Sequence, residues 1–125
     1  MAMNEIFPDC IRVIDRLCQD FNVYVLSIGT AENISKKALF IESMFPNIKN
    51  CILLVQSDCK MDKSIVKMGK GDWIIDDVYS NLETSSAGNR ILFSYANLFN
   101  EWNEYGNKIE ITPSWRVIER RIYGQ

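Results

Sequence analysis

The stretch Gly71–Leu82, "GDWIIDDVYSNL", decides how this chain is expected to fold. Its apolar run, Trp73–Ile75, leads directly into two adjacent acids, Asp76 and Asp77. Two like charges at the end of a buried strand are costly unless a cation or hydrogen-bond donors meet them. The alternative is that one acid caps a helix or turn and its neighbour is solvated. Two further capping candidates follow, Ser80 and Asn81.

Apolar periodicity on either side of this stretch predicts alternating helices and strands. Spacings of three and four predict a helix from Ile6 to Phe21 and a second one from Thr30 or Asn33 to the stop at Pro46. Short apolar runs predict strands at Asn22–Ser27, Cys51–Gln56, Asp72–Asp76 and Arg90–Tyr95. The tail predicts a short helical segment, a strand at Lys108–Ile111 and a last helix that starts at Pro113 or Ser114. Helices alternating with strands predict an α/β fold, with a parallel sheet covered on both faces in a three-layer, Rossmann-like arrangement.

The composition predicts one globular domain over residues 1–125, since no repeat or Pro/Gly-rich linker divides the chain. Hydrophobic residues make up 47% and charged residues 24%, which excludes disordered and fibrous classes. The net charge of −2 gives no general attraction to nucleic acid polymers or acidic membranes. The start "MAMNEIF" lacks a signal pattern, and every apolar run is short, so a cytoplasmic protein is expected.

Cysteine and histidine usage narrows the chemistry further. None of the four cysteines lies in a C-x-x-C pair, so reduced, structural thiols are expected at Cys10, Cys18, Cys51 and Cys59. The chain contains no histidine, which excludes histidine triads, histidine metal sites and histidine general bases.

Polar groups gather where the predicted strands end, and ligands bind there in open parallel sheets. Ser27 ends one strand and Asp76 another, while Lys63 lies in the preceding loop, "MDKSIV". A hydroxyl, an ammonium and the start of the following helix suit a phosphate dianion. The paired carboxylates of Asp76 and Asp77 suit Mg²⁺. The sequence therefore predicts a phosphate and magnesium pocket.

Plainer interpretations of the same residues remain open. Ser27 also suits a turn after a strand. Lys63 shares its loop with three other lysines, Lys60, Lys67 and Lys70, and such runs are usually solvated. Lys37 is also typical of an exposed helix position.

These motifs together resemble the haloacid-dehalogenase-like phosphatases, and within them the 5′(3′)-deoxyribonucleotidases. The matching pieces are "VYVLS" with Ser27, "DKSIV" with Lys63 and "DWIIDDVYSNL" with Asp76 and Asp77. Weaker similarities extend over most of the chain: "FPDCIRVIDRL", "KALF" from Lys37, "ILFSYANLFNE" and "SWRVIERRI". The resemblance implies that Ser27, Lys63 and Lys37 bind phosphate and that Asp76 and Asp77 hold Mg²⁺. It also implies a nucleoside monophosphate or phosphate as ligand.

The chain departs from that family at one decisive point. Family members begin with a strand carrying D-x-D, which supplies the nucleophile and the acid/base, and these 125 residues contain no Asp-x-Asp. The missing strand would lie between the Ser27 and Asp76 strands. Either these two strands pair directly, or an exchanged segment or partner chain fills the gap; a homodimer is expected.

The resulting expectation is an incomplete nucleotidase-like domain that keeps a phosphate and Mg²⁺ pocket but is inactive alone. The alternative is a Mg²⁺-dependent phosphatase of deoxynucleoside monophosphates, active when another chain supplies the D-x-D segment.

Overall fold

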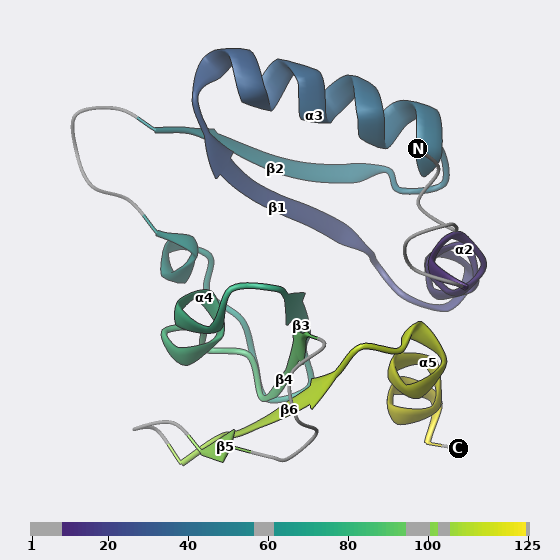
Figure 1. Cartoon of the computed structure of the whole chain (residues 1–125), viewed down its shortest axis with the longest axis vertical. Coiled ribbons are helices and arrows are strands. Elements are labelled where there is room, and N and C mark those ends of the chain that lie inside the picture. Colours follow the sequence, from purple (N-terminus) through teal and green to yellow (C-terminus); the bar gives the residue numbers. More distant parts are fainter. Residues whose placement is uncertain (1–8, 57–61, 95–100, 103–105, 125) are drawn as a thin grey trace. The chain divides into compact units, whose positions relative to one another are not determined.

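The computed structural model describes residues 9–56, 62–94, 101–102 and 106–124, which divide into two compact units. The first unit is Met1–Met61 and the second is Asp62–Gln125. Each has its own sheet, of two strands in the first unit and four in the second (Figure 1). The α/β class is therefore confirmed in its coarse form, with small parallel sheets and helices, while the single domain over residues 1–125 stays a prediction.

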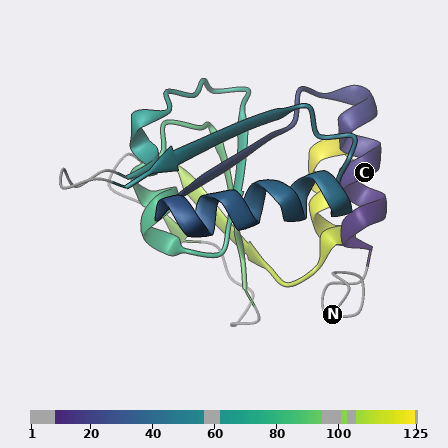
Figure 2. The same cartoon turned by 90° about the horizontal axis from the view of Figure 1, so that it is seen from above.

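The first unit is built on a pair of parallel strands. Its elements are α2 (Cys10–Asp20), β1 (Tyr24–Gly29), α3 (Ala31–Met44) and β2 (Asn50–Val55). The pairing runs in register from Tyr24 opposite Asn50 to Gly29 opposite Val55. Helix α3 connects the two strands and lies beside both of them, as Figures 1 and 2 show from two directions. This is a β-α-β unit, the usual connection between parallel strands.

Local sequence signals account for α3. Thr30, one of the two expected caps, is the N-cap, and its Oγ1 accepts a hydrogen bond from the backbone N–H of Asn33 at 3.3 Å. Ile34, Ile41 and Phe45 recur at helical spacing and are all buried. Pro46 follows the last turn, where a proline cannot continue the helix. The sequence thus fixes both ends of α3 and its buried face.

The second unit contains a mixed sheet with the order β3-β4-β6-β5. Strands β3, β4 and β6 are parallel, and the short β5 is antiparallel to β6. The elements in chain order are the 3-10 turn η1 (Lys63–Ile65), β3 (Trp73–Asp76), α4 (Tyr79–Glu83), β4 (Asn89–Phe93), β5 (Glu101–Trp102), β6 (Lys108–Thr112) and α5 (Trp115–Tyr123).

Apolar side chains from the strands and helices form the core of this unit. The buried members are Leu82, Ala87, Ile91, Ile109, Ile111 and Ile118. The ring of Trp115, at the start of α5, packs against Phe93 of β4 with the ring centroids 5.5 Å apart. Ser114 caps α5 by accepting a hydrogen bond from the N–H of Val117, so the second of the two expected starts is the N-cap.

A buried arginine holds the short helix α4. Arg90 is 2% exposed, and its Nη1 donates to the carbonyl oxygen of Leu82 at 2.6 Å, with longer contacts to the carbonyls of Glu83 and Ser85. Leu82 and Glu83 lie in the last turn of α4, and Ser85 follows shortly after it. Burial lowers the pKa of Arg90, although not enough to discharge a guanidinium near neutral pH. Arg90 thereby connects β4 to α4.

The strands of the first unit differ from expectation in their ends and in their burial. Strand β1 starts at Tyr24 and continues beyond Ser27 to Gly29, because the Gly29 carbonyl accepts a hydrogen bond from the N–H of Gln56. The expectation that β1 and β2 are buried strands is wrong at most positions: of their twelve residues only Ser27 is buried, and Tyr24 and Val55 are 56% and 50% exposed.

Three expected helical features also need correction. Helix α2 begins at Cys10, and residues 6–8 of the expected helix lie outside the described residues. Ser80 and Asn81 do not cap α4, whose N-cap is Val78. In the tail, Glu101 and Trp102 form β5 instead of a helical turn, and the rest of that segment lies outside the described residues.

Each unit forms its sheet from its own strands. Among the strands that the structure describes, β1 pairs only with β2, and β3 pairs only with β4. The direct pairing of the Ser27 and Asp76 strands, one of the two expected outcomes, stays a prediction, because the two strands belong to different units. The other outcome, in which a further segment or a partner chain supplies a strand, stays a prediction.

Candidate functional site

A serine hydroxyl and a lysine ammonium meet in the first unit. Ser27 lies in the carboxyl-terminal half of β1 and is 4% exposed. Lys37, on the second turn of α3, donates from Nζ to Ser27 Oγ at 2.7 Å. An ammonium has three N–H donors and a serine hydroxyl can donate as well as accept, so the pair has donors left for an anion.

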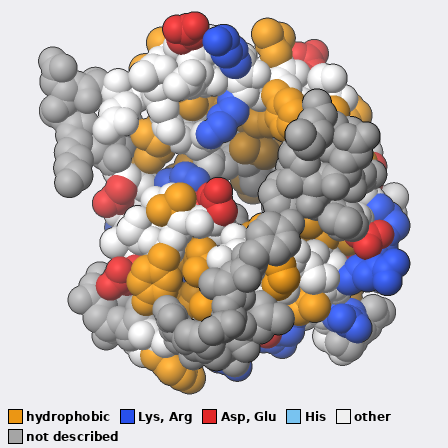
Figure 3. All heavy atoms as spheres, viewed as in Figure 1, with side chains coloured by type: hydrophobic (Ala, Val, Ile, Leu, Met, Phe, Trp, Pro, Cys, Tyr) orange, Lys and Arg blue, Asp and Glu red, His pale blue; other side chains and the backbone are white. Residues whose placement is uncertain are grey.

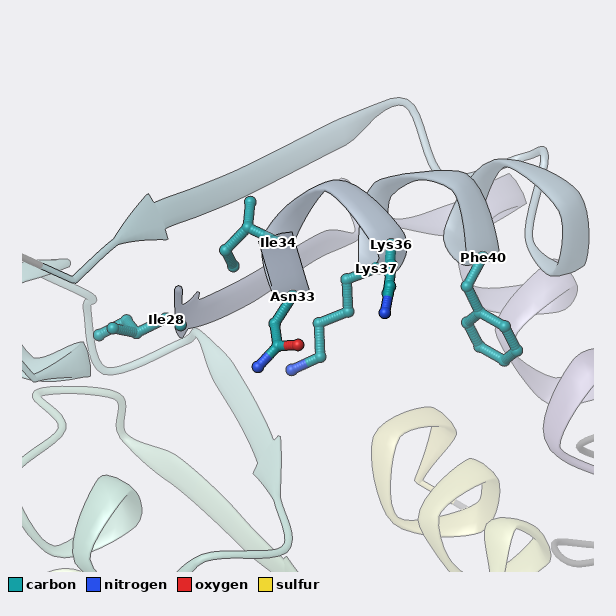
Figure 4. A pocket seen from close by; sticks show the side chains of 7 residues that line it. Ile28, Asn33, Ile34, Lys36, Lys37 and Phe40 are labelled. Atoms are coloured by element: carbon teal, nitrogen blue, oxygen red, sulfur yellow. The ribbon is translucent and has the colours of Figure 1, made fainter. Parts of the chain in front are cut away.

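A hollow of about 380 Å³ lies beside Lys37, which is one of its lining residues, whereas Ser27 does not line it (Figure 4). All seven residues that line it belong to the first unit: Ile28, Gly29, Asn33, Ile34, Lys36, Lys37 and Phe40. In Figure 4 the side chains of Asn33, Lys36, Lys37 and Phe40 project from α3 toward the same side. Their spacing of three and four along the helix explains this common face. The hollow therefore combines amide, ammonium and aromatic groups.

Lys36 and Lys37 differ in what holds them. Lys36 forms an ion pair with Glu32, one turn earlier, at 3.3 Å, and both side chains are more than 70% exposed. Exposed pairs of this kind contribute little. Lys37 is held by a buried hydroxyl, so its ammonium is the better-positioned cation of the two.

A second contact made by a lysine lies in the second unit, where Lys63 forms an ion pair with Asp76. Lys63 Nζ donates to Asp76 Oδ2 at 2.6 Å, and the two side chains are 18% and 5% exposed. Asp62 caps η1 by accepting a hydrogen bond from the Ser64 N–H, which places Lys63 at the start of this turn. Of the loop lysines, Lys63 is thus the one that contacts the acid; Lys60 lies outside the described residues.

Further donors complete the surroundings of Asp76. The backbone N–H of Val78 donates to Oδ1 at 2.9 Å, and the Asn81 amide donates to Oδ2 at 3.3 Å. Burial by itself would raise the pKa of Asp76, but the hydrogen bonds from Lys63, Val78 and Asn81, with the charge of Lys63, outweigh it and hold the pKa below its usual value. Asp76 is therefore ionised near neutral pH.

The neighbouring acid has a different environment. Asp77 is exposed, and among the described residues no three or more acidic, cysteine or histidine side chains are placed so that they could hold a metal ion. Three donors already occupy the carboxylate of Asp76, which leaves few lone pairs for a metal. With these three donors in place, the Asp76 carboxylate is better suited to pair with the Lys63 ammonium than to bind a Mg²⁺ ion. Magnesium binding by Asp76 and Asp77 stays a prediction.

The five predicted site residues fall into two groups. Ser27 and Lys37 belong to the first unit, and Lys63, Asp76 and Asp77 to the second. The contact between Ser27 and Lys37 and the contact between Lys63 and Asp76 are both formed. The convergence of all five residues on one phosphate site stays a prediction.

Sequence reasoning missed two residues that shape these groups. Asn81 was expected to cap a helix, yet its amide holds Asp76 from five positions away. Phe40 lines the hollow next to Lys37, although only the "KALF" similarity drew attention to it. The spacing Lys37 to Phe40, one helical turn, is the signal that could have found Phe40.

Hydrophobic, acidic and basic side chains lie side by side on the face seen in Figure 3. An anion that binds this protein must therefore be met by locally placed groups such as Lys37.

Comparison with known proteins found no match among protein-family models, curated proteins or solved structures. None of the described helices is long and apolar enough to cross a membrane.

Proposed function

We propose that these 125 residues bind a phosphate monoester through Ser27 and Lys37 and do not hydrolyse it on their own. One observation carries the proposal: the 2.7 Å contact that places an ammonium on a buried hydroxyl beside an open hollow. The groups lie toward the carboxyl end of a parallel strand, where α/β proteins bind ligands. The resemblance to haloacid-dehalogenase-like nucleotidases suggests a nucleoside monophosphate, bound by a truncated Rossmann-like domain.

The environment of Asp76 in the second unit supports phosphate binding without hydrolysis. Phosphoryl transfer through an aspartyl intermediate needs a carboxylate that can attack phosphorus. The two oxygens of Asp76 accept hydrogen bonds from three donors, which lowers their nucleophilicity. The sequence offers no D-x-D pair and no histidine that would serve instead.

The alternative is a phosphatase completed by a D-x-D segment from another chain. The unpaired edges of β1 and β3, as far as the described strands go, favour it, because a further strand would satisfy their backbone groups. In such an enzyme Asp76 and Asp77 would ligate Mg²⁺, which neutralises developing charge on the phosphate. Lys63 would then neutralise the phosphoryl oxygens, and Ser27 and Lys37 would orient the group.

Titration of the purified chain with inorganic phosphate, followed by NMR or calorimetry, tests the proposal. Lys37→Met should weaken binding at least about ten-fold, because hydrogen bonds to charged groups contribute about 1.5–3 kcal/mol. Lys49→Met is the matched control, since Lys49 is exposed and does not line the hollow. Equal phosphate affinity of Lys37→Met and the native chain would refute the proposed site.

A second measurement separates the two candidate functions. Phosphate release from a deoxynucleoside monophosphate in the presence of Mg²⁺ should be at background for the 125-residue chain. Turnover that appears only after a D-x-D-containing segment is added would favour the completed enzyme. Turnover by the chain alone would contradict the non-hydrolytic proposal.

A further inference from the structure

A buried arginine in the second unit has hydrogen-bond donors that no described group accepts. Arg90, on β4, is almost fully buried, and its Nη1 donates to carbonyl oxygens at and just after the end of α4. Its Nε and Nη2 atoms are also buried, yet within the described part of the chain neither has an acceptor. Buried polar side-chain atoms nearly always have a partner, so these two donors call for an explanation.

The two unpartnered atoms form one edge of the guanidinium group. Nε and Nη2 direct two parallel N–H bonds to the same side of the group. This arrangement matches the two oxygens of a carboxylate or of another planar oxyanion, which accept the two bonds together. The contacts to α4 occupy Nη1 and leave this edge open. The open edge of Arg90 is therefore the one suited to a bidentate acceptor.

Arg90 also carries a charge that no described side chain neutralises. None of the ion pairs among the described residues includes it. Burial lowers the pKa of Arg90, and the nearby group that opposes this effect is Tyr79, a phenol that is uncharged near neutral pH. The guanidinium nevertheless stays protonated. Since a buried charge without a counter-charge is strongly destabilising, an anion would stabilise the second unit more than a neutral water molecule would.

The burial of Arg90 limits the size of this acceptor. Leu82 and Ser85, which contact the guanidinium through their carbonyl oxygens, are buried as well. A ligand that reaches the open edge must therefore be small, and its entry requires a local opening of the unit. A carboxylate attached to a large body does not meet this condition.

We propose that the Nε and Nη2 edge of Arg90 binds a small planar oxyanion, such as formate or bicarbonate. Two oxygens of the anion accept the two parallel N–H bonds, and its negative charge compensates the guanidinium. The site lies in the second unit and does not involve Lys37, so it is independent of the proposed function.

NMR of the arginine Nε–H groups tests this site on the native chain. The chain is unfolded in urea, refolded in chloride buffer to remove any retained oxyanion, and titrated with formate at constant ionic strength. The Arg90 signal should shift downfield and saturate, because a charge-assisted hydrogen bond deshields the proton. The signal of Arg120, which is exposed on α5, should not. Benzoate carries the same carboxylate on a larger body and should leave the Arg90 signal unchanged.

Three variants accompany the titration. Arg90→Lys keeps the charge but loses the paired N–H bonds, so formate binding should weaken at least about ten-fold, measured as the formate-dependent rise in the urea midpoint. Arg120→Lys is the matched control and should respond to formate as the native chain does. Lys37→Met should also retain the response of the Arg90 signal. If Arg90→Lys does not fold, as circular dichroism would show, the titration of the native chain decides alone.

Each result supports or overturns the site. An Arg90 signal that does not respond to formate or bicarbonate would overturn the proposal in favour of a buried water molecule. An equal response to benzoate would overturn it too, because the edge would then be open to solvent. Loss of the formate response in Lys37→Met would place the anion at Lys37 instead. Failure of the chain to bind inorganic phosphate at Lys37 would contradict the proposed function and leave this inference standing.

Discussion

Replacement of Lys63 by methionine should destabilise the second unit through Asp76. The Lys63 Nζ to Asp76 Oδ2 contact is 2.6 Å, and the side chain of Asp76 is only 5% exposed. Methionine keeps most of the aliphatic length of lysine but removes the charge. The substitution therefore leaves a buried carboxylate without its cation.

The expected loss in the free energy of unfolding follows from the burial of the Lys63–Asp76 pair. Removal of one partner from a fully buried ion pair costs about 3–5 kcal/mol, because the other charge remains desolvated. Lys63 is 18% exposed, and Asp76 keeps its bonds from Val78 and Asn81, so part of that cost is avoided. We expect a loss of about 2 kcal/mol in the free energy of unfolding near neutral pH.

The effect should depend on pH with a definite sign. The pKa of Asp76 is lowered in the folded state from its ordinary value of 3.8. A group of this kind contributes stability above its unfolded pKa, and the contribution is lost as the pH falls through the folded pKa. The difference in stability between the native chain and Lys63→Met should therefore shrink on acidification below about pH 4.

Urea unfolding followed by tryptophan fluorescence is the assay, because the three tryptophans, Trp73, Trp102 and Trp115, all lie in the second unit. Lys67→Met, at an exposed position of the same segment, is the control and should change stability by less than about 0.5 kcal/mol. The double variant Lys63→Met/Asp76→Asn should be less destabilised than the sum of the single ones. Strict additivity, or a loss of stability that is the same at acidic and neutral pH, would refute the reasoning.

Three other changes have equally definite expected outcomes. Gly88→Ala should cost at least about 2 kcal/mol, because its Cβ would collide with the backbone carbonyl of Lys70; a urea midpoint equal to that of the native chain would contradict this. Thr30→Ala should lose about 1 kcal/mol of local stability, seen as faster hydrogen exchange in the first turn of α3, whereas Thr30→Ser should not. Cys51 is exposed and should react with a thiol reagent near pH 8, whereas Cys10 is buried with its pKa raised to about 11 and should react only on unfolding, as mass spectrometry of labelled peptides would show.

The elements predicted best are those with a strong apolar period or a clear cap. Helix α3 has Thr30 as its N-cap and buries Ile34 and Ile41, as its spacing indicates. Strand β3 matches the predicted strand Asp72–Asp76 within one residue, because the adjacent acids and the preceding glycine limit it on both sides. Local signals decide such cases without help from distant residues.

Features that depend on distant partners could not be predicted in the same way. The extension of β1 to Gly29 needs the N–H of Gln56, the residue that follows the partner strand β2. Burial of Arg90 contradicts the usual exposure of arginine and is understood only from the carbonyls at the end of α4. In both cases contacts with residues distant in the sequence override what the local sequence predicts.

The candidate site was predicted in part for the same reason. Lys63 and Asp76 were proposed as members of one site, and their contact is formed. The role of Asn81 was not foreseen, because α4 is a single short helix whose position, and not its sequence, brings the amide to Asp76. Contacts across a turn are thus harder to predict than contacts along a strand or helix.

The composition of β1 has a practical consequence for work with the purified protein. Its six residues, Tyr24–Gly29, include no proline and no charged side chain, and among the described strands only β2 pairs with it. Natural edge strands usually carry such residues, which discourage the addition of strands from other molecules. Concentrated solutions should therefore be prone to slow precipitation or fibril growth, and a lysine at an outward-facing position such as Tyr24 should extend storage life.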